Sequence, residues 1–280
     1  MHAIPGVYLE ERFLGRNLLL GLILIWKSKI GIIAGWLFSG VLATVFLASE
    51  FSGRQPATLA LDIGLSALKL VMPVLIALAV QEILSKDIER RFYLYSFAYP
   101  NSKSQVLLGR LASVALVSVF TVFLMAIGIL LSVHLVSLGY NQATAVNLGI
   151  KFWIVIGFLS VDILSVVCVA VLFATISSTL GFVLIGTLGF TLVARSFSGV
   201  LRLLEGSTAV VENSAAYKGS VNVLGFIFPD LGSLDVRSIA LYNDMAQLPQ
   251  GWVMLLVATI FYMLTIIVLS GLIFRNRRFA

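Results

Sequence analysis

The stretch LASVALVSVFTVFLMAIGILLSVHLVSL, residues 111–138, contains no Lys, Arg, Asp or Glu, and the next such residue is Lys151. An α-helix needs roughly 20 predominantly apolar residues to cross the hydrocarbon core of a bilayer, at about 1.5 Å per residue. Further uncharged runs of sufficient length cover residues 30–49 and 245–274. The recurrence of such runs predicts a polytopic membrane protein built from helices.

The composition agrees with a membrane protein. Charged residues make up 11% of the chain and hydrophobic residues 60%, whereas a soluble domain typically carries about 25% charged residues. The net charge of +6 does not indicate nucleic-acid binding, because the basic residues lie at the ends of apolar runs, as the positive-inside pattern requires. We therefore expect no nucleic acid among the partners.

We expect an all-α fold in which residues 1–280 form a single transmembrane domain with six spans. The boundary between the fourth and fifth spans depends on TISSTLG, residues 175–181, whose small, turn-forming residues suit a tight hairpin. Residues 7–26 begin charged and end apolar, which predicts a helix in the cytoplasmic interface, with a simple extension of the first span as the alternative. The six spans are predicted at residues 30–49, 63–81, 111–138, 152–177, 180–197 and 252–274.

The distribution of Lys and Arg predicts the orientation. If the N-terminus lies in the cytoplasm, most basic residues lie on that side, and the short outer loops hold only Arg54 and Lys151. Both termini are therefore expected in the cytoplasm. Residues 198–251 would then be extracytoplasmic, and their apolar patches suggest helices that lie at the outer interface rather than a free domain.

The segment that follows the second predicted span is rich in charge: DIERRFYLYSFAYPNSKSQVLLGR, residues 87–110. Residues 82–99 are predicted to continue the span as a helix in which Lys86 pairs with Glu89 and Asp87 with Arg91. A turn is expected at Pro100. A helix–turn–helix with charges and aromatic rings at the cytoplasmic surface is typical of a docking element. The alternative is a solvated loop with snorkelling anchors.

This segment and the layout of the spans resemble the permease subunits of type-2 ABC exporters. The family's signature runs acid–x–acid–Gly–Thr, four or five residues, Pro–x–x–Arg, and then Gly–Lys at the next span. In this chain Arg90, Arg91 and Phe92 stand in place of Gly–Thr. The outer stretch FPDLGSLDVRSIALY, residues 228–242, resembles the subgroup associated with multicopper-enzyme maturation. The residues that carry the main resemblance are Asp87-Ile-Glu89, Pro100 with Lys103, and Gly109-Arg110.

The resemblance implies that two copies of the chain, or this chain and a homologous permease, dock two ABC ATPase subunits through residues 82–99 of the coupling segment, which covers residues 82–110. It also implies a bacterial inner membrane, contact with membrane lipids, and room for an extracytoplasmic accessory protein. ATP and Mg would be bound by the ATPase, because this chain has no G-x-x-x-x-G-K-[ST] motif. We expect no catalytic, cofactor or metal site in this chain. The expected docking residues are Glu82, Lys86, Asp87, Glu89, Arg90, Arg91, Phe92 and Tyr95.

A stripe of small residues, Gly31, Gly35 and Ser39, lies in the first span. Such a stripe lets another helix approach closely. In the family that the chain resembles, this span and the fifth meet across the dimer. Packing within one subunit is the alternative.

Three charged residues lie within the predicted spans: Lys69, Asp162 and Arg195. Such residues are costly in a bilayer and usually face a partner or a cavity. Their depths predict a structural pair of Asp162 with Lys69, together with snorkelling of Lys69 and Arg195. A role in lining a translocation pathway is the alternative. Two other functions stay open, namely an ion- or proton-coupled secondary transporter that uses Asp162 and Lys69, and a non-transport membrane scaffold.

Overall fold

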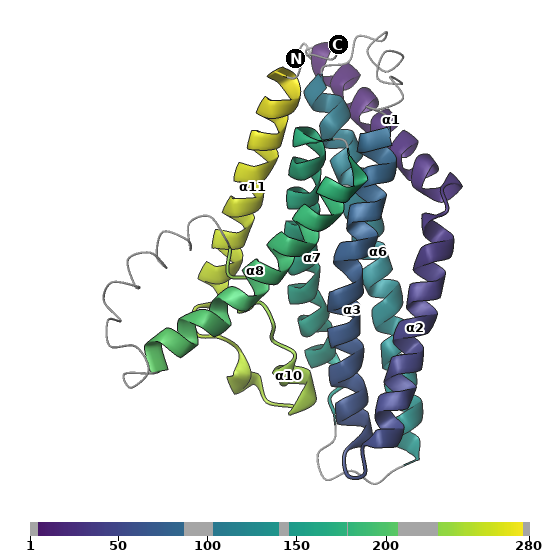
Figure 1. Cartoon of the computed structure of the whole chain (residues 1–280), viewed down its shortest axis with the longest axis vertical. Helices are drawn as coiled ribbons and strands as arrows, with labels where there is room; N and C mark the ends of the chain where they lie inside the picture. Colours follow the sequence, from purple (N-terminus) through teal and green to yellow (C-terminus); the bar gives the residue numbers. More distant parts are fainter. Residues whose placement is uncertain (1–4, 87–102, 140–145, 178, 207–228, 277–280) are drawn as a thin grey trace.

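The computed structural model describes residues 5–86, 103–139, 146–177, 179–206 and 229–276. Within this part of the chain the regular structure is helical and contains no strand (Figure 1), so the all-α prediction is confirmed there. Among the described residues, five helices are long and apolar enough to cross a membrane. They are α2 (Ile30–Phe51), α3 (Pro56–Val80) extended by the π-helix η1 (Gln81–Ser85), α6 (Lys103–Leu138), α7 (Ile150–Ile176) and α11 (Trp252–Asn276).

The fifth predicted span, residues 180–197, corresponds to α8 (Leu180–Gly206), which runs obliquely to the other long helices (Figure 1). Its apolar part, Gly181–Phe197, is shorter than the other five candidates. At about 1.5 Å per residue this part reaches about 25 Å, which is less than the roughly 30 Å of a typical hydrocarbon core. A crossing of the membrane by α8, which would bring the number of crossings to six, therefore remains a prediction.

The break between α7 and α8 falls inside the predicted turn. The residue after α7, Ser177, has extended backbone angles, and its Oγ lies 3.0 Å from Thr179 Oγ1. The two hydroxyl groups thus form a hydrogen bond with each other at the point where the backbone hydrogen bonds of α7 end.

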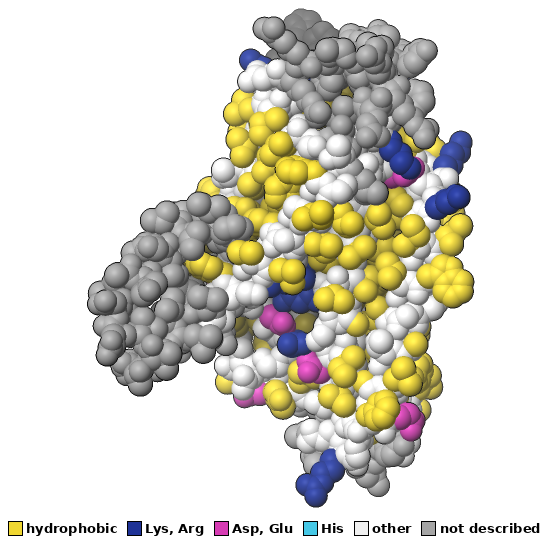
Figure 2. Space-filling model, viewed as in Figure 1, with side chains coloured by type: hydrophobic (Ala, Val, Ile, Leu, Met, Phe, Trp, Pro, Cys, Tyr) yellow, Lys and Arg dark blue, Asp and Glu magenta, His cyan; other side chains and the backbone are white. Residues whose placement is uncertain are grey.

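The centre of the bundle is formed by α3 and α7, which pack against each other; α3 also contacts α2, α6 and α8, and α7 also contacts α11. Leu68 of α3 and Ile163 of α7 are fully buried. By contrast, α2 and α11 display large apolar side chains, with Trp36 76% and Phe261 66% exposed, and Figure 2 shows apolar side chains over much of one face. A surface of this kind is stable in lipid and would be a liability in water.

The N-terminal helix α1 (Pro5–Lys27) is separate from α2, because Ser28 and Lys29 interrupt the helix and α1 runs on at an angle (Figure 1). It packs on the start of α6. Ser113 Oγ of α6 donates a hydrogen bond to the Leu18 carbonyl at 2.9 Å. A Cβ at Gly109 would lie 2.6 Å from Asn17 Cβ, so only glycine permits this approach. The position of α1 at a membrane interface remains a prediction.

Residues 229–251 fold back over the ends of α3 and α7 rather than forming a free domain. They include α10 (Ser238–Leu241) and the short 3-10 helix η2 (Met245–Gln247). Lys151 Nζ, at the start of α7, donates to the Asn243 carbonyl at 2.7 Å, and Asn147 Nδ2 donates to Asn243 Oδ1 at 2.8 Å. This segment, called the outer segment below, therefore belongs to the bundle. Residues 207–228 lie outside the described residues.

Candidate functional site

Six charged side chains gather where the outer segment meets the helices, and we call them the charge network. Three are acids and three are bases, so their formal charges cancel. Figure 2 shows acidic and basic side chains together in the middle of an otherwise largely apolar face. The members are Asp62 and Lys69 of α3, Asp162 of α7, Arg195 of α8, and Asp235 and Arg237 of the outer segment.

The innermost member of the network is Asp162, which is 1% exposed. Its Oδ2 accepts a hydrogen bond from Arg195 Nη2 at 2.8 Å. A second guanidinium nitrogen, Arg195 Nη1, donates to the Lys69 carbonyl at 2.7 Å. One guanidinium thus joins α7, α8 and α3, with the short, charge-assisted contacts that stabilise an ion pair away from water.

Lys69 lies closer to another acid than to Asp162, the partner that the sequence predicted. Its Nζ lies 4.0 Å from Asp162 Oδ2 but 3.1 Å from Asp235 Oδ2, so its closer acid comes from the outer segment. The expected snorkelling of Arg195 is wrong, because its guanidinium points to Asp162. The depth of a residue along a helix can be counted from the sequence. The rotation and tilt of the helix, which decide which side chain that residue meets, cannot.

The outer segment contributes a second arginine to the network. Arg237 Nη1 lies 2.9 Å from Asp62 Oδ1, and Arg237 Nε lies 3.6 Å from Asp235 Oδ1. Arg237 also donates to the hydroxyl of Ser66. Sequence reasoning missed Asp62, Asp235 and Arg237 as parts of a site. The only local feature of the sequence that pointed to a site was an acid and a base two residues apart, Asp235 and Arg237.

The cavity beside the network, lined by Lys69, Asp162 and Asp235 among others, measures about 20 Å³. A cavity needs roughly 10–15 Å³ to hold a single water. In this conformation the network therefore has no room for a transported solute. Its ion pairs instead connect neighbouring helices.

Two of the predicted docking residues, Glu82 and Lys86, lie at the other end of α3. Glu82 is in η1, and Lys86 Nζ donates to Glu82 Oε2 one helical turn away. Lys86 thus has an acidic partner on its N-terminal side; the predicted pairs with Glu89 and between Asp87 and Arg91 fall outside the described residues. Also outside them are the docking residues Asp87, Glu89, Arg90, Arg91, Phe92 and Tyr95.

The small-residue stripe of α2 faces outward. A Cβ built at Gly31 or Gly35 would meet no atom within 4 Å among the described residues, and both glycines are exposed. Ser39 Oγ donates to the Gly35 carbonyl at 3.0 Å within the same helix. Packing of the stripe within one subunit is therefore not seen in the described part of the chain.

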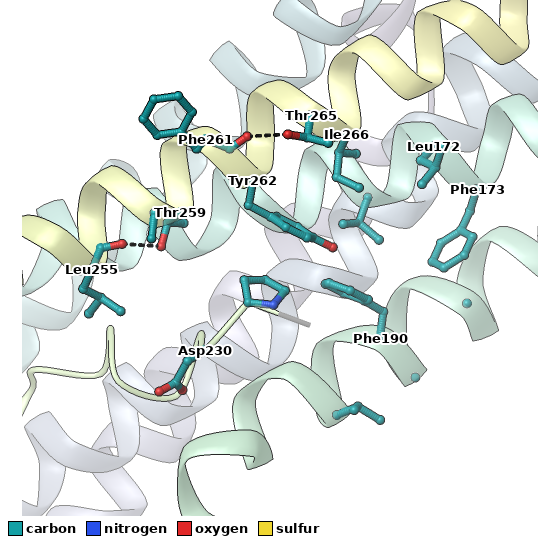
Figure 3. A pocket seen from close by; sticks show the side chains of 16 residues that line it. Leu172, Phe173, Phe190, Asp230, Leu255, Thr259, Phe261, Tyr262, Thr265 and Ile266 are labelled. Atoms are coloured by element: carbon teal, nitrogen blue, oxygen red, sulfur yellow. Dashed lines mark hydrogen bonds between the residues drawn. The ribbon is translucent and has the colours of Figure 1, made fainter. Parts of the chain in front are cut away.

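A groove of about 940 Å³ lies between α7, α8 and α11 (Figure 3), and we call it the lateral groove. The wall from α8 includes Gly189 and Val193, and that from α11 includes Leu255 and Tyr262. Phe190 and Tyr262 stack across it, with ring centroids 6.4 Å apart. Asp230 lies at its rim.

The described residues contain no group of three or more His, Cys, Asp or Glu side chains that could hold a metal ion. Neither the protein-family models nor the curated proteins include a match to this chain.

Proposed function

We propose that this chain is the membrane-spanning subunit of an ATP-driven ABC transporter, and that residues 82–99 dock a separate ATPase subunit. The observation that carries the proposal is the continuity of helix on both sides of the charged segment. Helix α3 continues through η1 to Lys86, and α6 begins at Lys103 and runs for 36 residues. A force applied to the segment would therefore act directly on two long apolar helices.

A further contact supports this coupling. Helix α1 packs on α6 and also contacts η1, so one helix braces both sides of the charged segment. The π-helical geometry of Gln81–Ser85 adds to the argument, because π segments are frequent at functional sites. We infer that α1, η1 and the start of α6 move together when an ATPase docks.

The translocation pathway would form between two permease copies in the bacterial inner membrane, with both termini in the cytoplasm. The outward-facing stripe at Gly31, Gly35 and Ser39 supports a helix–helix contact between subunits. The ATPase would bind ATP and Mg, and lipids would surround the apolar faces of α2 and α11.

An ion- or proton-coupled secondary transporter is the second candidate, because Asp162 is a buried carboxylate within a span. Its pairing with Arg195 and the balanced charge of the network favour a structural role instead. A site that couples ion binding to transport would need an acidic side chain that changes its ion-pair partner during the transport cycle.

The test co-expresses the chain with a candidate ABC ATPase subunit and measures co-purification and ATP hydrolysis in proteoliposomes. The double reversal Glu89→Arg with Arg91→Glu is expected to abolish ATPase co-purification while the chain still inserts. Arg54→Glu, a charge reversal at the opposite end of α3, is the matched control and should retain the complex. Unchanged co-purification and hydrolysis in the double variant would contradict the docking proposal. Transport that needs an ion gradient and no ATP would favour the second candidate.

A further inference from the structure

The lateral groove has an almost entirely apolar wall. From α7 it includes Val169 and Phe173, and from α11 it includes Leu255 and Ile266. Besides Tyr262, α11 adds two polar side chains to the groove, Thr259 and Thr265. Their hydroxyl groups donate to carbonyls of their own helix at 2.8 Å and 2.9 Å, so they offer no free donor (Figure 3). A groove of this kind, open along the side of membrane-spanning helices, is suited to a hydrocarbon chain.

The length of the groove matches one leaflet. Leu255 and Ile266 line it from positions eleven residues apart on α11, which corresponds to about 16 Å at 1.5 Å per residue. Half of a typical hydrocarbon core is about 15 Å. The groove therefore accommodates an acyl chain from the leaflet on the side of the outer segment.

Among the described residues that line the groove, Asp230 is the one with a charged side chain. Asp230 lies at the end where α11 begins, close to Leu255 and Thr259 (Figure 3). None of the 16 lining residues is Lys or Arg. Asp230 Oδ1 accepts from the Ser233 amide at 3.2 Å, and its carboxylate forms no ion pair with a described residue. A carboxylate above an apolar groove, with no basic partner among the described residues, is complementary to an amphiphile whose head carries an ammonium group.

We propose that the lateral groove binds one phospholipid of the outer leaflet whose headgroup ends in a primary ammonium. Its acyl chain lies between α8 and α11, and its ammonium donates to the Asp230 carboxylate. Anionic lipids such as phosphatidylglycerol are disfavoured, because their headgroup would face a like charge. This site is separate from the docking segment and from the charge network, and it does not depend on ATP.

The experiment adds phosphatidylethanolamine or phosphatidylglycerol with identical acyl chains to the delipidated full chain in detergent, and counts the retained lipids by native mass spectrometry. We expect phosphatidylethanolamine to be retained roughly tenfold more strongly, the effect of one charge-assisted hydrogen bond. In Asp230→Asn this preference should vanish. The asparagine keeps the oxygen that accepts from Ser233, so the turn is expected to persist.

A second pair of variants tests the groove itself. A Cβ at Gly189 would meet no atom within 4 Å, so Gly189→Leu is expected to place its side chain in the groove and to reduce retention of both lipids severalfold. Gly157→Leu is the matched control, because Gly157 is exposed on α7, has open space and does not line the groove. Thermal unfolding confirms that each variant folds.

Equal retention of the two lipids by the unaltered chain would overturn the headgroup assignment. Unchanged retention in Gly189→Leu would show that bound lipids lie elsewhere on the apolar surface and would overturn the site. Since no ATPase is present, either result leaves the docking proposal intact, and a failed docking test leaves the lipid site intact.

Discussion

The residue that organises the charge network is Arg195. It donates to Asp162 of α7 and to the Lys69 carbonyl of α3 while belonging to α8 itself. Its fixed fork of donors suits two acceptors on different helices, which an ammonium on a flexible stem satisfies less well. Lys69 instead connects Asp162 to Asp235, so the two bases share one buried acid.

Asp162→Asn should destabilise the chain, because it leaves Arg195 without its buried counter-charge. Breaking a buried pair from one side typically costs about 3–5 kcal/mol. Arg195→Met in the Asp162→Asn background should recover more stability than Lys69→Met, because Arg195 Nη2 is 2.8 Å from Asp162 Oδ2 and Lys69 Nζ is 4.0 Å away. A double-mutant cycle on the thermal unfolding midpoint in detergent measures both couplings.

Glu50→Gln, on an exposed residue of α2, is the control for loss of a carboxylate and should leave the midpoint unchanged. A stronger rescue by Lys69→Met would contradict the assignment of Arg195. Normal stability of Asp162→Asn combined with lost transport would instead indicate an acid that lines a pathway.

At the scale of elements, the contact between α1 and α6 depends on small residues. A Cβ at Gly21 would clash with the side chain of Ser113, whose Oγ is already held between the carbonyls of Leu18 and Gly109 at 2.9 Å and 2.8 Å. Because Ser113 has little freedom to move away, the glycine allows the two helices to touch. We infer that this contact fixes α1 beside the coupling segment.

Gly21→Ala should therefore weaken the α1–α6 contact, with an overpacking cost of about 1–3 kcal/mol. Gly15→Ala is the matched control, because Gly15 lies on the same helix with no atom within 4 Å of a built Cβ. Alanine there should be neutral or stabilising, since it raises helix propensity by up to about 1 kcal/mol. Hydrogen exchange of α1 amides measures the difference, and equal protection in the two variants would argue against a tight contact.

At the scale of the whole molecule, the charges separate into two regions along the bundle. The outer segment lies at the end where α3 begins, the network extends from it to Lys69 and Asp162 in the middle of α3 and α7, and Glu82 and Lys86 lie where α3 and η1 end. The apolar faces of α2 and α11 extend between them. The Lys and Arg distribution predicts that the outer segment faces away from the cytoplasm.

Cysteine labelling of intact cells tests the orientation. In a Cys168→Ser background, Gly53→Cys between α2 and α3 should react with a membrane-impermeant maleimide. Arg275→Cys at the end of α11 should react only after the cells are opened. Both positions are exposed, whereas Cys168 is buried, so reactivity reports the side of the membrane. The reverse pattern would invert the topology.

The sequence by itself located the apolar helices, although α3 begins at Pro56 and α6 at Lys103, ahead of the predicted spans at residues 63–81 and 111–138. The uncharged runs at residues 30–49 and 252–274 correspond to α2 and α11, and the turn residues at 175–181 contain the end of α7 and the start of α8. These features are local, because apolar run length and turn chemistry act within a few residues. The same runs established that the chain is suited to a membrane.

Only the tertiary structure decided which charges meet and where the lateral groove lies. Lys69 and Asp235 are 166 residues apart in sequence, and Asp162 and Arg195 are 33 apart. Their contacts depend on the tilt of α8, the rotation of α7 and the return of the outer segment over the bundle. Sequence periodicity constrains these quantities weakly, because long spans are apolar on most faces and their packing is set by the shape of neighbouring helices.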